Sequence, residues 1–448
     1  MHTARFLPPG PALPALLQGI QYAFRPGPFF ETCARRYGEC FTLRMPVGPP
    51  IEVMFSDPEA IRQIFTGNED ALRGGEAFIA LQPLLGASSI LALDGARHER
   101  ERRLMMPPFH GERMLAYGDT MRAIVDRAIE RWPIGRPFPI HPEMQAITLE
   151  VILRTVFGAE GERLDALRSL VQRLSRVMAN PIWLWPRLQI DLGPRSPWGR
   201  FLRVKRDLDT FLFAEFARRR ADGSTARDDV LSLLLAARYE DGEPMRDEEL
   251  RDQMLTLLFA GHDTTATSLA FAVHNILCHP EVRERLREEL VHVVGAGPLA
   301  PEHVGKLEYL DATVKETLRL NPIISEVGRV LARPMRIGGW DLPAGVMAAP
   351  CIYLAHRRPD VWPEPERFNP KRFVGRRPSP YEFFPFGGGV RRCLGMAFAL
   401  YEMKVVLAEV ASRVELRLAT GYRMQRVRRS ITLAPSKGMP VVVERRAA

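Results

Sequence analysis

Apolar side chains recur at intervals of three and four residues through most of the 448-residue chain, and this is the spacing of an amphipathic α-helix. The pattern predicts helices over 111–131, 144–157, 161–179, 198–220, 246–278, 280–294 and 308–320. The longest of them begins with acidic residues and ends before Pro280, as the helix dipole and the proline ring favour. A further helix is predicted over 395–416, after the last cysteine.

Patterns typical of β-strands are few and short by comparison. They occur in an early and a late region of the chain, at 40–45, 51–55, 335–349, 431–435 and 439–444. Proline-rich stretches interrupt the helical pattern without a shift in composition, and no internal repeat is evident. We therefore expect a single domain over residues 1–448 that is mainly α-helical with small peripheral β-sheets.

The composition suits a large globular protein, with 46% hydrophobic and 26% charged residues. The formal net charge of +9 raises the question of nucleic-acid binding. Arginine, however, alternates with glutamate in stretches such as EVRERLREEL (281–290), which is typical of solvated helix faces. No nucleic-acid-binding motif is present, so we expect no nucleic-acid partner. The alternative that a basic surface binds an acidic protein partner stays open.

The cysteines indicate a reducing compartment. They are Cys33, Cys40, Cys278, Cys351 and Cys393. Their odd number and the lack of a CxxC pair argue against a disulfide framework or a zinc finger. The N-terminal apolar run is about ten residues long, too short for the roughly 20 that cross a bilayer, and it lacks the layout of a signal peptide. We expect a cytoplasmic protein without a membrane anchor.

One of these cysteines lies in the unusual stretch FPFGGGVRRCLG (384–395). The stretch has neither the spacing of a phosphate-binding loop nor that of a redox pair. The helix predicted after it places Cys393 at a helix N-terminus, where free amides and the dipole stabilise a thiolate, and Arg391 and Arg392 act in the same direction. Glycines let the backbone approach a flat or bulky group. The pattern favours a ligand for a soft metal; the alternative is a buried cysteine beside a flexible loop.

The long helix contains a weak point, LLFAGHDTTATS (257–268). Gly261 and the threonines are poor helix formers, and the Thr264 hydroxyl can bond back to the Ala260 carbonyl and distort the helix. An acid and an alcohol, Asp263 and Thr264, lie together there. The alternative interpretation is an N-cap that starts a second helix.

Two further pairs lie on single helix faces. Glu316 and Arg319 are three residues apart, and Arg367 in PEPERFNPKRF can join them in a network, although such pairs are usually surface ion pairs. His98 and Arg102 are four residues apart on a short helix, for which the alternative is a solvated basic face.

In this order along the chain, these stretches resemble the signatures of the cytochrome P450 superfamily, and of its soluble bacterial members in particular. The signature around the haem-ligating cysteine is matched by Phe386, Gly387, Gly389, Arg391, Cys393 and Gly395, and its extension by Ala399 and Glu402. The resemblance covers almost the whole chain. It implies the cytochrome P450 fold, in which haem lies between a long distal helix and a proximal cysteine loop.

The resemblance also implies roles for these residues. Cys393 is expected to be the axial thiolate ligand of haem b, in a loop shaped by Phe386, Gly387 and Gly395. The haem propionates are expected to be bound by His98, Arg102, Arg329 and Arg391. Asp263 and Thr264 are expected to relay protons to O2 beside Ala260. Glu316, Arg319 and Arg367 are expected to be structural.

A largely apolar substrate pocket is implied in the same way. Its expected lining is Phe78, Leu81, Leu85, Ile90, Trp183, Phe259, Ile323, Ile324, Val327 and Leu433. Such a pocket indicates a lipophilic substrate held mainly by shape, with a fatty acid or terpene favoured and a polyketide or steroid as further options. Two polar candidates are Arg73, for a substrate carboxylate, and Glu326, for a hydroxyl or amine.

The implied reaction is the insertion of one oxygen atom from O2, by hydroxylation or epoxidation. No flavin or iron–sulfur segment is fused to the chain, so NAD(P)H electrons are expected through a separate ferredoxin or flavodoxin and its reductase. That donor would dock on Arg100, Arg103, Arg392 and Lys404 of a monomer. One alternative is a haem-thiolate peroxygenase or isomerase, which the acid–alcohol pair disfavours. Another is a basic helical interaction protein without enzymatic activity.

Overall fold

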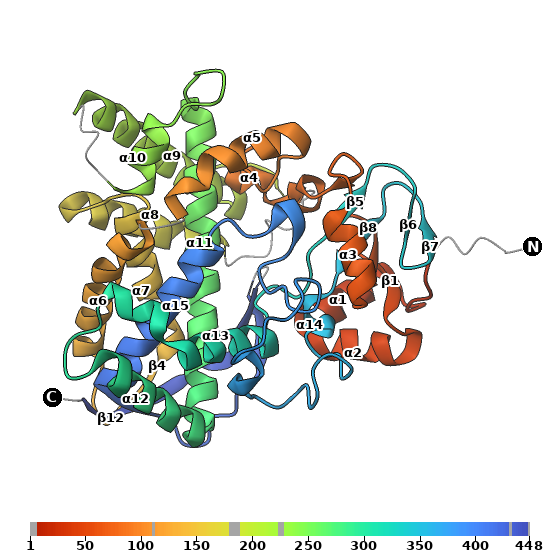
Figure 1. Ribbon diagram of the computed structural model, residues 1–448. Helices are drawn as coiled ribbons and strands as arrows, with labels where there is room; N and C mark the ends of the chain where they lie inside the picture. The colour runs from red at the N-terminus through yellow and green to blue at the C-terminus, as the bar shows by residue number, and fades with distance from the viewer. Residues whose placement is uncertain (1–6, 110–112, 179–188, 223–227, 430–431, 447–448) are drawn as a thin grey trace, which may run out of the picture.

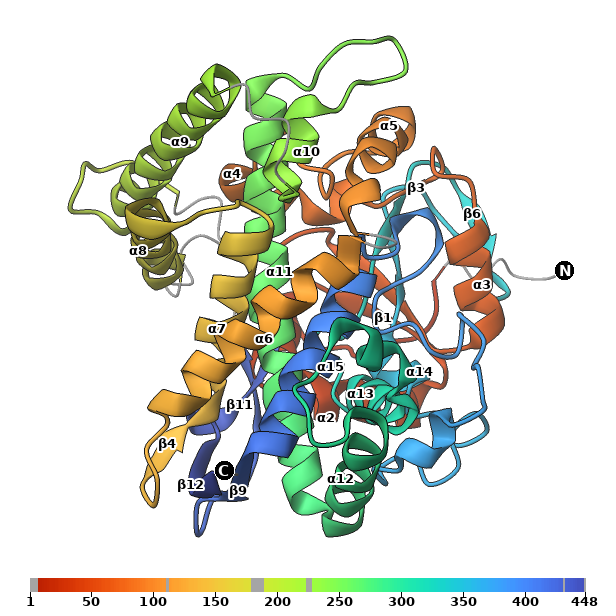
Figure 2. The same cartoon turned by 60° about the vertical axis from the view of Figure 1, so that its left-hand side comes forward.

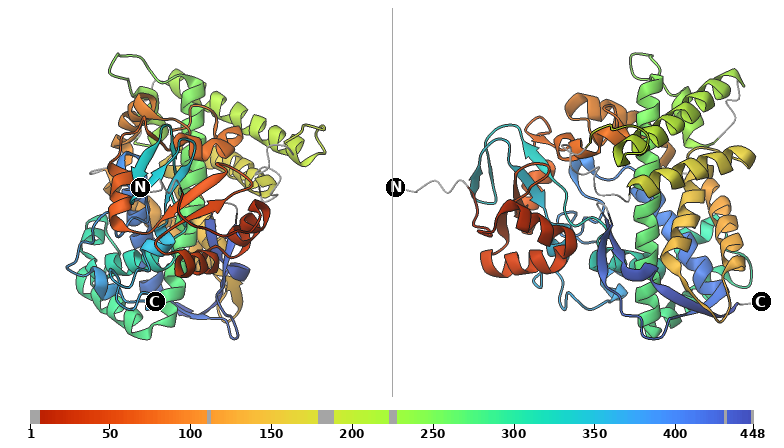
Figure 3. Two further views of the ribbon diagram at one scale, coloured as in Figure 1. Left: turned by 90° about the vertical axis from the view of Figure 1, so that its right-hand side faces the viewer. Right: turned by 180° about the vertical axis from the view of Figure 1, so that it is seen from behind.

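A single long helix organises the molecule. The computed structural model describes residues 7–109, 113–178, 189–222, 228–429 and 432–446 (Figure 1). Helix α11 (Asp247–Cys278) runs through it, with α6 to α9 on one side and the N-terminal part with its small sheet on the other (Figures 1 and 3). The buried half of α11 includes Ala266, Ala270 and Ala272, so neighbouring helices approach its backbone closely.

The helices predicted from the apolar spacing are present, with small shifts at their ends. They are α6 (Arg113–Arg131), α7 (Ile140–Thr155), α8 (Gly161–Met178), α9 (Pro197–Ala221), α11, α12 (Pro280–Val294), α13 (Glu308–Leu320) and α15 (Met396–Arg413). Helices α7 and α15 both pack along α11 (Figure 2). Among the described residues no helix is both long enough and apolar enough to cross a membrane.

Shorter helices connect these elements. The α-helices are α1 (Ala15–Phe24), α2 (Pro26–Tyr37), α3 (Pro58–Thr66), α4 (Gln82–Leu85), α5 (Gly95–Met105), α10 (Val230–Ala236) and α14 (Ile352–Ala355). The 3-10 helices are η1 (Gly75–Leu81), η2 (Pro107–Phe109), η5 (Pro301–Lys306), η6 (Pro370–Phe373), η7 (Gly389–Arg391) and η8 (Ser436–Gly438). Helix α3 shows why such a short helix begins where it does: the Asp57 carboxylate accepts a bond from the N–H of Ala60 (2.8 Å), and Pro58 follows the cap.

The largest sheet has the strand order β1-β2-β8-β5-β3. These strands are β1 (Cys40–Arg44), β2 (Ile51–Phe55), β3 (Leu72–Arg73), β5 (Arg329–Leu331) and β8 (Met347–Pro350). Strands β1 and β2 are antiparallel with Thr42 opposite Val53, whereas β2 and β8 are parallel with Val53 opposite Ala348. The sheet therefore brings residues of the N-terminal quarter beside residues far along the chain.

The other sheets are smaller. Strands β4 (Pro137–Pro139), β12 (Pro440–Arg446) and β9 (Val414–Leu418) form one sheet, and β6 (Met335–Ile337) with β7 (Trp340–Leu342) and β10 (Arg426–Arg429) with β11 (Thr432–Pro435) form two hairpins. The prediction of a mainly helical molecule with small sheets is confirmed. The helix predicted over 395–416 is too long, because Val414 begins β9, which pairs with β12.

Candidate functional site

The cysteine loop (384–395) is a series of tight turns that leads into α15. The N–H of Cys393 donates to the Phe386 carbonyl (2.9 Å), and the N–H of Arg392 donates to the Gly389 carbonyl (3.1 Å). Gly389 has a φ of +64°, and a Cβ there would lie 2.2 Å from the carbonyl oxygen of Phe65. Only glycine fits, so the loop is pressed against the end of α3.

Two other glycines of the loop leave space beside it. Gly387 has a φ of +68°, and the nearest atom to a Cβ there would belong to Val327, at 3.7 Å. A Cβ on Gly395 would meet nothing within 4 Å. These positions form an open cradle next to the thiol, which fits a flat group lying against the loop. The side chain of Phe386 is half-buried and packs against the main core.

The Cys393 side chain is accessible at this opening, although the protein encloses it on most sides. Burial raises the pKa of the Cys393 thiol, whereas the N–H of Gly395 and the positive charge of Arg102 lower it. The cation that favours the thiolate is thus Arg102, whereas the sequence analysis assigned this effect to Arg391 and Arg392. A metal bound to this sulfur would remove the proton outright, because a thiolate is the ligand form.

The weak point of α11 is a continuous turn of helix, so the alternative of an N-cap and a second helix is wrong. The Thr264 hydroxyl donates to the Ala260 carbonyl (2.7 Å), as the sequence indicates. Ala260 is exposed in the middle of an otherwise buried helix, so this turn faces open space. A Cβ on Gly261 would lie 2.8 Å from Ile152, which shows that this glycine admits the close approach of α7.

Asp263 is held by partners that sequence analysis missed. Its Oδ1 accepts a hydrogen bond from the Gln145 amide on α7 (2.7 Å), and its Oδ2 lies 3.4 Å from the Thr432 hydroxyl on β11. The acid and the alcohol are therefore adjacent in sequence but bonded in different directions. The imidazole of His262, between Gly261 and Asp263, bonds to the Leu258 carbonyl (3.0 Å).

Three arginines and one histidine from three parts of the chain meet beside the cysteine loop: Arg102, Arg329, Arg391 and His98. Burial lowers the pKa of Arg329 to about 10, and the charge of Arg391 acts in the same direction. Burial also lowers the pKa of His98 to about 3, with a further contribution from the three arginines. Because these groups repel one another in a shielded place, the cluster fits an added anion such as the two carboxylates of haem.

Two acidic side chains that the sequence analysis did not identify already balance part of this cluster. Asp94 pairs with Arg391 (2.5 Å), and Oε1 of Glu69 lies 3.4 Å from Nδ1 of His98. Arg391 thus pairs with Asp94 in the structure, and its expected contact with a haem carboxylate stays a prediction. Arg102, in contrast, forms no ion pair or hydrogen bond with the described residues, so its guanidinium is open to an added anion.

A buried ion pair joins Glu316 and Arg319 on α13, with Nε to Oε2 at 2.7 Å and both side chains 0% exposed. The guanidinium of Arg319 also donates to the carbonyls of His356 and Pro365 (2.8 Å each) and of Arg367 (3.3 Å). The alternative of a surface ion pair is therefore wrong, and the arginine fastens the segment that precedes the cysteine loop.

Arg367 joins this network, as the sequence predicted, but it does so through its backbone carbonyl. Its side chain is 65% exposed and pairs with Glu364 (3.3 Å). The guanidinium beside Glu316 belongs instead to Arg372, whose Nε lies 3.4 Å from Oε1. Both arginines stand in the same stretch, PEPERFNPKRF, and no feature of that stretch tells which one turns inward.

The predicted pocket residues differ in accessibility. The side chains that keep accessible surface are Phe78, Phe259, Ile324 and Val327. Those that are buried are Leu81, Leu85, Ile90, Ile323 and Leu433. The N–H of Leu433 bonds to the Ile323 carbonyl (3.1 Å), so the two late segments do lie together. Trp183 lies outside the described residues.

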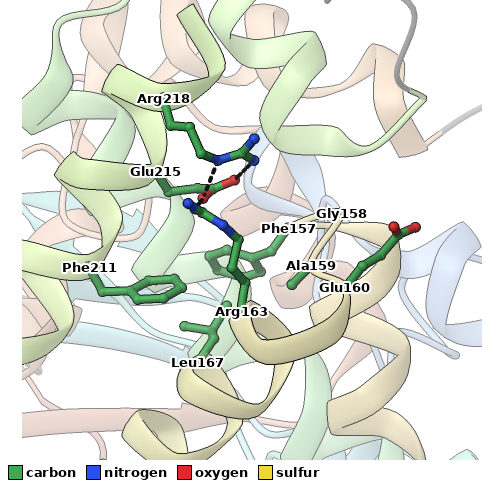
Figure 4. Close-up of a pocket in the computed structure, with 9 residues that line it drawn as sticks. All are labelled: Phe157, Gly158, Ala159, Glu160, Arg163, Leu167, Phe211, Glu215 and Arg218. Carbon is green, nitrogen blue, oxygen red and sulfur yellow. Dashed lines mark hydrogen bonds and ion pairs between the residues drawn. The ribbon is translucent and has the colours of Figure 1, made fainter. Parts of the chain in front are cut away.

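A groove of about 530 Å³ opens along the outside of the cysteine loop. Its basic lining residues are Arg102, Lys315 and Arg392. A smaller cavity of about 170 Å³ lies between α8, α9 and residues 157–160 (Figure 4). There Glu215 is bonded to both Arg163 and Arg218, so these charges are satisfied within the protein.

Comparison with known proteins gives one consistent family. The model of the family described as Cytochrome P450 matches residues 7–441. A Mycobacterium tuberculosis protein with the provisional name cytochrome P450 135B1 is 42% identical over 446 residues, which cover 98% of this chain and 91% of that protein. A second, provisionally named cytochrome P450 138, is 36% identical over 442 residues, covering 98% and 97% of the two chains.

Solved structures agree with these sequences. Cyanobacterial CYP120A1 with bound retinoic acid has a TM-score of 0.86 and 26% identity, with 99% of this chain and 100% of that chain covered. The haem domain of cytochrome P450DA has a TM-score of 0.85 and 24% identity, covering 99% and 98% of the chains, which shows likeness of fold.

The buried ion pair leads to a prediction about stability. Replacing Arg319→Leu leaves the Glu316 carboxylate buried without its main partner, so the free energy of unfolding should fall by about 3–5 kcal/mol. Urea unfolding followed by circular dichroism measures this. The matched variant Arg367→Leu removes an exposed guanidinium and should change the free energy of unfolding by no more than about 0.5 kcal/mol. Equal effects of the two variants would contradict the assignment.

Proposed function

Because the chain belongs to the cytochrome P450 family, it is a haem-thiolate oxidoreductase of the monooxygenase class, and we propose that it inserts one atom of O2 into a lipophilic small molecule. The observation that carries this proposal is the acid–alcohol pair, Asp263 and Thr264, on the open turn of α11. Haem-thiolate peroxygenases and isomerases usually lack this acid–alcohol pair on the distal helix, so its presence disfavours that alternative. An interaction protein without enzymatic activity would not explain why the chain belongs to the cytochrome P450 family.

In this proposal the Cys393 thiolate would bind the haem iron. The space beside Gly387 and Gly395 would admit a flat ring, and Ala260 is the exposed residue of α11. When bound, haem supplies the oxidising chemistry, and thiolate ligation favours cleavage of the O–O bond. Arg102 is the best placed of the three arginines to bind a haem carboxylate, because its guanidinium is not used by the described residues.

The protein itself contributes proton transfer. We assign to Asp263 the role of holding a proton at a carboxylate oxygen, and to the Thr264 hydroxyl that of passing it toward O2. The half-buried amide of Gln145 fixes Asp263 by its bond to Oδ1 (2.7 Å). Gln145 is thus a positioning residue, which holds the Asp263 carboxylate in place next to Thr264.

A lipophilic substrate is supported by the apolar character of the accessible side chains at Phe78, Phe259, Ile324 and Val327. CYP120A1, which binds retinoic acid, offers a relative with a lipophilic acid as ligand. A fatty acid or a terpene is the substrate class we favour. Arg73 pairs with Glu76 (2.8 Å), so its charge is already matched and does not select a carboxylate. The Glu326 carboxylate likewise accepts a hydrogen bond from Tyr22.

For electron supply we propose an acidic ferredoxin or flavodoxin that docks on the groove outside the cysteine loop. Three of the predicted docking cations are engaged elsewhere: Arg100 with Asp241, Arg103 with Glu99 and Glu240, and Lys404 with Asp311. Arg392 is exposed and lines the groove together with Arg102. Because Arg102 is assigned to a haem carboxylate, Arg392 is the stronger candidate for attracting a negatively charged donor.

The thiolate assignment predicts that Cys393→Ala loses the thiolate-type absorption band of the reduced carbon-monoxide complex. Absorption spectroscopy of purified protein reconstituted with haem measures it. The control is Cys278→Ala, which removes an exposed thiol at the end of α11 and should leave the band unchanged. An unchanged band in Cys393→Ala would refute the assignment.

The proton-transfer proposal predicts that Thr264→Ala lowers the amount of product formed per NAD(P)H and raises peroxide release, by about tenfold or more. Thr264→Ser keeps a hydroxyl and should restore most of the coupling. Gln145→Leu should uncouple the enzyme in the same direction but less, since Asp263 and Thr264 remain. Product, NAD(P)H and peroxide are measured in one assay; full coupling in Thr264→Ala would count against the relay.

The docking proposal predicts that reduction of the haem by an acidic ferredoxin slows by about tenfold as salt is raised, because screening weakens attraction between exposed charges. Arg392→Glu should slow reduction at low salt. Arg195→Glu makes the same charge change at an exposed residue before α9 and should have little effect. Stopped-flow absorption gives the rates, and rates independent of salt would exclude electrostatic docking.

A further inference from the structure

Residues 238–244 form a short acidic hairpin between α10 and α11. The N–H of Tyr239 donates to the Glu243 carbonyl (2.9 Å), which closes the hairpin. Glu240 and Asp241 form its tip, and these two side chains and that of Glu243 are exposed. Figure 2 shows the loop between α10 and α11 above α5. The acidic hairpin therefore brings several carboxylates to the surface of α5.

The carboxylates of the acidic hairpin meet two arginines of α5. Asp241 pairs with Arg100 (Oδ2 to Nη2, 2.9 Å), and Glu240 pairs with Arg103. The two arginines are three residues apart and so lie on one face of the helix. This face borders the groove outside the cysteine loop, since Arg102, which precedes Arg103, lines that groove. An acidic segment of the chain thus occupies cations at the edge of the proposed docking surface.

Tyr239 anchors the acidic hairpin independently of these ion pairs. Its side chain is buried, and its hydroxyl donates to Oε1 of Glu101 on α5 (2.5 Å). The guanidinium of Arg100 lies 3.8 Å from the centre of the same ring. The tip acids are exposed in contrast, with 79% of the Glu240 side chain and 55% of the Asp241 side chain accessible. The hairpin can therefore stay in place while other carboxylates replace those of its tip.

The exposure of these ion pairs determines how firmly they hold. An ion pair between solvent-exposed side chains contributes little to stability, and salt weakens it further. A protein that brings several carboxylates to α5 can therefore displace Glu240 and Asp241. Until it does so, the tip acids cancel the charges of Arg100 and Arg103, which weakens the attraction of this face for an acidic protein at a distance.

We propose that the acidic hairpin is an internal competitor of the acidic electron donor. Glu240 and Asp241 hold Arg100 and Arg103 in the free protein, and carboxylates of the donor take their place in the complex. The hairpin thereby slows association and favours donors whose acidic groups reach both arginines. This inference rests on the proposed docking of an acidic ferredoxin or flavodoxin, and it adds a means by which the protein controls that docking.

Stopped-flow reduction of the haem-loaded full chain by an acidic ferredoxin tests the inference. Glu240→Gln/Asp241→Asn should raise the second-order rate constant at low salt by about three- to tenfold, and the gain should vanish at high salt. The matched control on α8 is Glu162→Gln/Asp165→Asn, because Asp165 is exposed and pairs with Arg168 (2.6 Å). It changes the net charge equally and should raise the rate constant by less than about twofold.

A second set of variants tests whether the gain comes from the released arginines. Arg100→Gln/Arg103→Gln should lower the rate constant more in the Glu240→Gln/Asp241→Asn background than in the parent, so that the gain disappears. Thermal unfolding by circular dichroism and the absorption spectrum of the haem confirm that each variant is folded and loaded.

The outcomes separate this inference from the docking proposal on which it rests. If salt slows reduction of the parent but Glu240→Gln/Asp241→Asn reacts no faster than its control, the competitor role is overturned and the docking proposal stands. A gain that persists without Arg100 and Arg103 also overturns the competitor role. A parent whose rate constant is independent of salt overturns electrostatic docking, and the competitor role with it.

Discussion

The buried guanidinium of Arg319 is the contact on which the cysteine loop depends. It neutralises Glu316 and at the same time holds the His356 carbonyl (2.8 Å). His356 in turn accepts a hydrogen bond from the N–H of Phe384, where the cysteine loop begins (3.0 Å). Burial, and then the charge of Arg319, keep the pKa of His356 well below its ordinary value, so its Nε2 stays an acceptor. The ion pair between Glu316 and Arg319 thereby fixes the start of the cysteine loop, which carries Cys393.

The opposite end of the loop is fixed by a second arginine. Arg391 binds Asp94 (2.5 Å), and Asp94 also accepts from the N–H of Gly75 (2.8 Å), so this carboxylate ties the loop to the residues that precede α5. Because α5 is held there, Arg102 on the same helix is held near Cys393, where its charge favours the thiolate. The two arginines thus have different roles: Arg391 fixes the geometry of the loop, and the positive charge of Arg102 stabilises the thiolate of Cys393.

Features that act within one helix or one loop could be predicted from the sequence. Helix α11 begins and ends within one residue of the predicted bounds, because its acidic first turn and the following proline are local signals. Contacts between distant segments could not be predicted: 118 residues separate Gln145 from Asp263, and no spacing relates them. The sequence also did not tell that Arg367 would contribute a carbonyl and Arg372 the guanidinium. That the chain is one domain in the cytoplasm stays a prediction.

Helix α1 shows why apolar spacing alone does not orient a helix. Hydrogen bonds contribute about 0.5–1.5 kcal/mol each, and a buried amide without them costs more, so Gln18 can hold the helix with its leucines outward. Burying the leucines of α1 would stabilise the protein by a similar free energy, but it would break the hydrogen bonds of Gln18. The hydrophobic effect alone would therefore favour a different orientation of the helix.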